Sequence, residues 1–95
     1  RHVMNITIAR YKLAYDSLCI LDPIPVKRET EKCYWSREDC GWTRVLKSDI
    51  GIVKHLDATT YPYLEIRMIN ATEEELRNKL AEWFEQKAKQ LRKTK

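Results

Sequence analysis

The chain has 95 residues, with 18 basic and 14 acidic side chains and a net charge of +4, and 43% of its residues are hydrophobic. This length and composition predict one folded domain, residues 1–95, with a modest core, and they exclude a disordered chain. No apolar run approaches the roughly 20 residues that cross a bilayer, so we expect no membrane contact. The odd number of cysteines, three, favours a reducing, cytoplasmic location over a disulfide framework.

The chain begins with Arg1 rather than methionine, and two origins fit this start. Residues 1–3 are left from cloning ahead of a native start at Met4, or a secretory leader has been removed. Two segments, Asn5-Ile6-Thr7 and Asn70-Ala71-Thr72, match the glycosylation acceptor pattern, which is short enough to occur often by chance. A secreted form therefore stays open as the alternative to the cytoplasm.

Residues 3–21 fit two different structures. Ile6 and Ile8 alternate with polar neighbours, which is typical of a strand, and a phase slip near Arg10 indicates a bulge or a turn. A helical stripe is also present, formed by Ile8, Tyr11, Tyr15 and Leu18. The enrichment in β-branched and aromatic residues favours the strand.

The middle of the chain predicts short strands joined by turns. Two prolines in residues 22–25 exclude a helix and a central strand, and residues 26–32 are expected to form a solvated loop. Four further strands are predicted at residues 33–35, 42–46, 52–56 and 61–69. The first two of these form a hairpin, in which Gly41 can adopt a positive φ.

Residues 72–93 predict one long amphipathic helix. Thr72 and Glu75 have the spacing of a capping box, and neither glycine nor proline interrupts the segment. At 100° per residue, one apolar stripe is formed by Leu76, Leu80, Trp83, Phe84, Ala88 and Leu91. The predicted fold class is therefore α+β: a small antiparallel sheet of about four to five strands, followed by one C-terminal helix packed on one face.

The helix is longer than the sheet that it covers. Twenty-two helical residues span about 33 Å, whereas a six-residue strand spans about 20 Å. Lys87 falls at the centre of the apolar stripe, where a closed core would bury its charge. We therefore expect firm packing to end near Phe84, and the last two turns to lie free or to meet a partner.

The basic end of this helix, residues 87–95, has five cations and no acid. The residues that we predict to contact a partner are Trp35 of the hairpin and Lys87, Lys89, Leu91, Arg92 and Lys93 of the helix. The predicted partner is another protein or a second copy of the chain, and nucleic-acid phosphates are the alternative. A solvated end whose cations complement the helix dipole is the competing interpretation.

We predict no metal site. Cys19, Cys33, Cys40 and His55 lack the close ligand pairs of zinc sites, and a Cys33–Cys40 disulfide is the alternative if the protein is secreted.

No catalytic site and no cofactor are predicted either. Asp57 and the Glu65-Ile66-Arg67 segment resemble the Asp…Glu-x-Lys arrangement of metal-dependent nucleases, but arginine replaces the lysine and does not deprotonate. No sequence neighbour orients His55 as a base, and two glycines do not build a phosphate loop.

A helix at residues 6–19 would give the element order α-β-β-β-α, which is the order of double-stranded RNA-binding domains. Those domains have lysines at the start of their second helix, whereas this chain has three glutamates at residues 73–75, which repel phosphate. We therefore assign no family.

The sequence favours a small non-enzymatic binding module with no evident small-molecule substrate. We expect a regulator or inhibitor that acts through protein contact or self-association, of the kind found among accessory proteins of viruses and mobile elements. Nucleic-acid binding through the basic helix end is the alternative.

Overall fold

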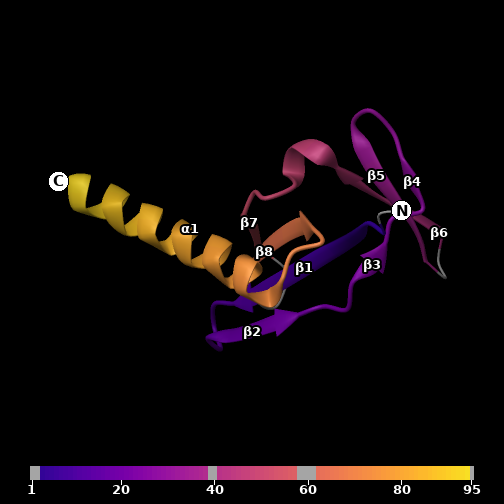
Figure 1. Ribbon diagram of the computed structural model, residues 1–95. Coiled ribbons are helices and arrows are strands. Elements are labelled where there is room, and N and C mark those ends of the chain that lie inside the picture. Colours follow the sequence, from indigo (N-terminus) through magenta and orange to yellow (C-terminus); the bar gives the residue numbers. More distant parts are fainter. Residues whose placement is uncertain (1–2, 39–40, 58–61, 95) are drawn as a thin grey trace.

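The computed structural model describes residues 3–38, 41–57 and 62–94, and these residues form two antiparallel sheets and one helix (Figure 1). The main sheet contains β1 (Asn5–Lys12), β2 (Ser17–Ile20), β3 (Ile24–Pro25), β7 (Lys54–Asp57) and β8 (Pro62–Ile69). The second sheet contains β4 (Arg28–Glu29), β5 (Cys33–Glu38) and β6 (Gly41–Leu46). A 3₁₀ turn, Lys47–Asp49, leads back to the main sheet, and α1 (Glu73–Lys93) ends the described chain. The α+β class is confirmed.

Residues 6–19 form most of β1, a turn and the start of β2, so the helical alternative and the α-β-β-β-α order are wrong. β1 and β2 form a hairpin in which Ala9 pairs with Ile20, and its turn lies at residues 13–16 rather than near Arg10. Asp16 has a φ of 53°, a left-handed conformation that aspartate tolerates better than most residues. β1 is extended because it also pairs along its length with β8, where Ala9 lies opposite Ile66.

The second sheet was not predicted. The hairpin of β5 and β6 is confirmed and longer than expected, but it pairs with β4 instead of joining the main sheet. Residues 26–32 are therefore not simply a solvated loop. β4 is only Arg28–Glu29, so it has no alternation that a sequence pattern could reveal, and β3 carries Pro25 at a sheet edge, where proline is tolerated.

Two apolar clusters lie on opposite faces of the main sheet. The first lies between the sheet and α1 and contains Ala9, Leu64, Ile66, Leu76 and Leu80. The second contains Ile6 and Ile8 of β1 and Val45 of β6, with Tyr34 packed against it. The alternation of side chains along β1 explains this division, because Ala9 points to one face and its neighbour Ile8 to the other. The main sheet therefore separates the helix from the second sheet.

The capping box at the start of α1 is confirmed. The Glu75 amide donates to the Thr72 hydroxyl at 3.1 Å, and the Thr72 amide donates to the Glu75 carboxylate at 2.9 Å. The start of the helix is held on the sheet by Leu76 and Leu80, which are buried, and its C-terminal half projects beyond the sheet (Figure 1).

Asn70 joins the end of β8 to the start of β1. Its φ is 52°, its side-chain oxygen accepts from the Asn5 amide at 2.8 Å, and its side-chain nitrogen donates to the Val3 carbonyl at 2.9 Å. These contacts use the side-chain amide that the acceptor pattern would glycosylate.

We expect Asn70→Ala to lower the free energy of unfolding by about 1–2 kcal/mol, because two hydrogen bonds are removed and alanine is strained at this φ. Asn70→Gly also loses the two hydrogen bonds, but glycine adopts this φ without strain, so its free energy of unfolding should decrease less than that of Asn70→Ala. Urea denaturation of both variants measures this difference, and equal decreases would contradict a backbone contribution.

Candidate functional site

The projecting end of α1 consists of residues 84–94, all of which are exposed. Phe84 is 41% exposed and makes an edge contact with Tyr11 of β1, with ring centroids 5.6 Å apart. Leu91 is 76% exposed. The expectation that firm packing ends near Phe84 is confirmed.

Five of the six predicted partner-binding residues lie on the projecting end: Lys87, Lys89, Leu91, Arg92 and Lys93. The ammonium group of Lys87 lies 5.4 Å from the ring centroid of Trp83, so this side chain folds back along the helix. This cation–π contact places the Lys87 charge against the ring of Trp83, which belongs to the apolar stripe. The aliphatic part of the Lys87 side chain covers apolar surface while its ammonium group stays at the edge.

Trp35, the sixth predicted residue, lies on β5 in the second sheet. Figure 1 places this sheet at the opposite end of the molecule from the C-terminus of α1. The principal extents of the molecule, 49 × 28 × 22 Å, agree with this elongated arrangement. The structure therefore does not bring Trp35 together with the helix residues, and the two places are separate candidate surfaces.

The surroundings of Trp35 form a surface whose arginines the sequence did not predict. Trp35 pairs with Arg28 of β4 on one side and with Arg44 of β6 on the other, and Arg37 pairs with Trp42. A face of a sheet is shared by residues that lie opposite one another in neighbouring strands. It is also shared by residues two positions apart in one strand. Tyr34 and Val45, at the alternate positions, pack inward. The outer face therefore presents Arg28, Trp35, Arg37, Trp42 and Arg44, which we term the arginine–tryptophan face.

The guanidinium groups of this face lie close to its indole rings. The guanidinium of Arg28 lies 5.1 Å from the ring centroid of Trp35 and 5.9 Å from that of Trp42. The guanidinium of Arg37 lies 5.8 Å from the ring centroid of Trp42. That of Arg44 lies 5.9 Å from the ring centroid of Trp35. These distances allow cation–π attraction. Among the carboxylates whose side chains the structure describes, none forms an ion pair with any of the three arginines. These carboxylates therefore leave the three positive charges of the face unpaired.

Trp42 stands out by its exposure, and Trp35 by an indole nitrogen that is unpaired within the described ranges. Trp42 is 49% exposed, so about half of a large aromatic side chain faces solvent. The indole Nε1 of Trp35 is buried without a hydrogen-bond partner among the residues described. The repeats Trp35-x-Arg37 and Trp42-x-Arg44 were the available sequence signal, but only the strand register brings them together and adds Arg28.

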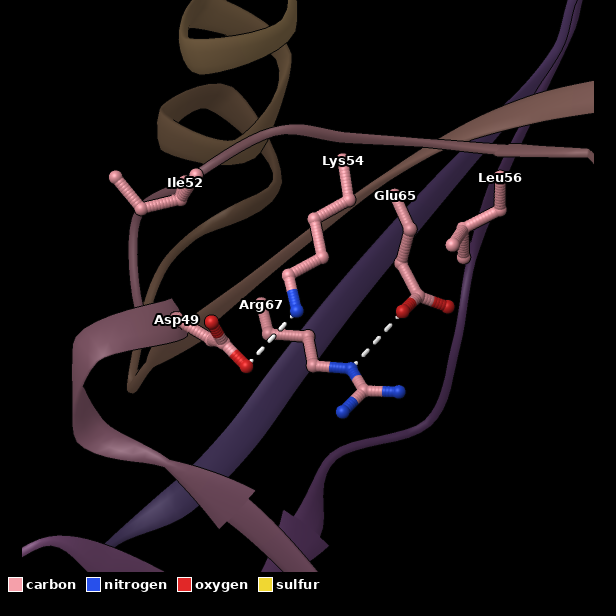
Figure 2. Close-up of a pocket in the computed structure, with 6 residues that line it drawn as sticks. All are labelled: Asp49, Ile52, Lys54, Leu56, Glu65 and Arg67. Carbon is pink, nitrogen blue, oxygen red and sulfur yellow. Dashed lines mark hydrogen bonds and ion pairs between the residues drawn. The ribbon is translucent and has the colours of Figure 1, made fainter.

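An ion cluster centred on the buried carboxylate of Glu65 lies on the main sheet, and Glu65 and Arg67 line a pocket of about 110 Å³ (Figure 2). The carboxylate of Glu65, 4% exposed, accepts from Nε of Arg10 at 2.7 Å and from Nε of Arg67 at 2.9 Å. Lys54 lines the same pocket and pairs with Asp49 at 2.8 Å. The hydrogen bond with Glu65 is the main cause that raises the pKa of Arg10. This cluster connects β1 to β8 and is a structural ion network.

The nuclease interpretation gains no support from the positions of its residues. Glu65 is engaged by two arginines, and Asp57 pairs with Pro62 at the far end of β7, whereas Lys54 lies opposite Glu65. In the described ranges, no group of three or more histidine, cysteine, aspartate or glutamate residues is arranged to hold a metal ion.

Two of the cysteines are free thiols. Cys33 is buried and pairs with Leu46 at the end of the hairpin away from its turn, and Cys19 is exposed on β2. The proposed pairing of Cys33 with Cys40 has one partner outside the described residues. Cys19 and His55 lie on β2 and β7, which are opposite edges of the main sheet.

Compared with known proteins, the chain matches no family model, no curated protein and no solved structure. Among the described residues, no helix combines the length and the apolar character that a bilayer crossing requires. The two surfaces described above are therefore the basis for assigning a function.

Proposed function

We propose that the protein is a small non-enzymatic binding module that acts through protein contact made by the projecting end of α1, with a second copy of the chain as its partner. The observation that supports this most is the exposure of Phe84 and Leu91 on a helix segment that leaves its sheet. A role as regulator or inhibitor of another process stays a prediction within this proposal.

The apolar stripe of α1 continues past the sheet. Leu80 is buried, Phe84 is 41% exposed, and Ala88 and Leu91 follow on the same side of the helix. Beside them, a groove of about 230 Å³ is lined by Tyr11, Leu18, Arg77, Leu80, Ala81 and Phe84. Helical segments of this length are marginal in water without tertiary packing. A continuous apolar stripe on such a segment is therefore expected to be covered by another helix.

Charge favours a second copy in the antiparallel orientation. At 100° per residue, Glu85 and Arg92 lie at nearly the same angle around the helix, two turns apart, beside the projecting part of the stripe formed by Phe84, Ala88 and Leu91. In an antiparallel pair that crosses near Ala88, residues on this side face one another, so Glu85 of each copy lies beside Arg92 of the other. The small side chain of Ala88 permits close approach at the crossing point. Two such ion pairs form by symmetry.

Sedimentation equilibrium over a range of protein concentrations tests this proposal. We expect a monomer–dimer equilibrium, and we expect Leu91→Glu to raise the dimer Kd by at least about tenfold, because burying one leucine is worth about 1.5–3 kcal/mol. Val3→Glu is the matched control, because Val3 is an apolar residue that is 68% exposed outside the helix. A monomer at all concentrations, or equal effects of both variants, would refute self-association through this surface.

Charge reversal tests the orientation. Arg92→Glu should weaken the dimer, and adding Glu85→Arg to it should restore the affinity, since the two antiparallel ion pairs reform with opposite polarity. A parallel pair would show no restoration.

A further inference from the structure

We propose that the arginine–tryptophan face of the second sheet binds single-stranded nucleic acid. This surface is distinct from the projecting end of α1, and the inference does not depend on self-association. It also differs from the nucleic-acid alternative of the sequence, which uses the basic end of the helix. The face belongs to β4, β5 and β6, which lie at the other end of the molecule (Figure 1).

The charge of the face favours a polyanion. Arg28, Arg37 and Arg44 are exposed, and none of the carboxylates whose side chains the structure describes pairs with them. Each guanidinium is held beside an indole ring at 5.1–5.9 Å, which fixes its position and leaves its hydrogen-bond donors for a ligand. Ordered guanidinium groups lose little conformational freedom when they bind phosphate.

The indole rings favour nucleobases over an acidic peptide. Carboxylate side chains can satisfy the arginines, but they make no use of a flat aromatic surface. Nucleobases stack on indole rings and on guanidinium planes, and such stacking tolerates many sequences. Trp35 lies on the central strand between Arg28 and Arg44, and Trp42 lies on the edge strand opposite Arg37, so both kinds of surface occur in one layer.

The positions of Trp35 and Trp42 favour a single strand over a duplex. Trp35 lies opposite Arg44, so Trp35 and Trp42 are diagonal neighbours on paired strands, a relation in which Cα atoms lie about 7–8 Å apart. The bases of a stacked duplex strand rise about 3.4 Å per residue and are covered by their neighbours. Only bases that are separated from one another can lie on both rings. A single strand provides this geometry.

Fluorescence anisotropy with labelled oligonucleotides tests the proposal. The probes are oligo-dT and oligo-rU of about 12 nucleotides, a length within the range that single-strand-binding folds cover, together with the corresponding DNA duplex and poly-glutamate as competitors. We expect the single strands to bind, and the duplex and poly-glutamate to compete weakly. Tight binding of the duplex, or full competition by poly-glutamate, would overturn the proposal.

Variants of the face separate stacking from charge. Trp42→Ala should weaken binding by about tenfold or more, and Trp42→Phe should retain most of the affinity, because phenylalanine still stacks. Trp42 is half exposed, so its replacement leaves the core intact, and circular dichroism verifies the fold. An unchanged affinity of a folded Trp42→Ala protein would overturn the proposal.

Two double variants that remove the same charge from different surfaces show where the nucleic acid binds. The double variant Arg28→Ala with Arg44→Ala should weaken binding and reduce the slope of log Kd against log salt by about 0.7 for each phosphate that is no longer neutralised. The double variant Lys89→Ala with Lys93→Ala removes the same charge from the helix end, on the side away from the apolar stripe, and should leave the affinity within about twofold. If instead the helix variant abolishes binding and the sheet variant retains it, the face is not the site.

Discussion

Replacing Leu76 with alanine is expected to lower the free energy of unfolding by about 3–5 kcal/mol and the Tm by about 15–25 °C. Leu76 is 1% exposed and lies in the cluster that joins α1 to Leu64 and Ile66 of β8. Its truncation removes buried apolar area and leaves a cavity that two regular elements, a helix and a sheet, cannot readily close.

Leu91→Ala is the matched control on the same helix. Leu91 is 76% exposed, so its truncation should change the free energy of unfolding of the monomer by less than about 0.5 kcal/mol. Urea denaturation at low protein concentration compares the two variants. Similar decreases at Leu76 and Leu91 would mean that the helix end is packed, contrary to the structure.

Replacing Glu65 with glutamine is expected to lower the free energy of unfolding by about 1–3 kcal/mol. Removing one partner of a fully buried ion pair costs about 3–5 kcal/mol. Arg10 and Arg67 are 40% and 34% exposed, so water compensates part of this cost and the expected value is smaller. The amide of glutamine retains the volume of the side chain, so the effect reports on charge.

Glu73→Gln is the control for this change. Glu73 pairs with Arg77 on the surface of α1, with both side chains 57% exposed, and such pairs contribute about 0–0.5 kcal/mol. Thermal and urea denaturation of both variants gives the comparison. Equal effects would contradict a special contribution of the Glu65 cluster.

The ion pair between Arg10 and Glu65 also has a consequence for the pH dependence of stability. Because the folded-state pKa of Arg10 is raised, the stability that it contributes is complete below the ordinary arginine pKa and disappears only as the pH rises through the raised value. We therefore expect this ion pair to cause no decrease in stability between about pH 7 and pH 10.

The helix and its limits could be predicted because their signals are local. The capping box depends on Thr72 and Glu75 alone, and the apolar stripe depends on spacing within one segment. The end of firm packing followed from comparing the length of a helix with that of a strand. The hairpin of β5 and β6 was found for the same reason, since Gly41 and the polar connector mark its turn.

The second sheet and the arginine–tryptophan face could not be predicted because they depend on pairing between distant residues. β4 is two charged residues, Arg28 and Glu29, and a solvated loop has the same composition. Arg28 reaches Trp35 only through the register of β4 with β5. The choice between strand and helix at residues 6–19 was likewise settled by pairing with β8, more than 40 residues away in sequence.

Hydrogen exchange of the α1 amides at several protein concentrations tests the central claim most directly. We predict that the amides around Leu76 and Leu80 are protected at every concentration, and that protection of residues 85–93 rises with concentration in the natural chain but not in Leu91→Glu. Protection of residues 85–93 that is high at all concentrations, or that never rises, would contradict a projecting helix end that pairs with a second copy.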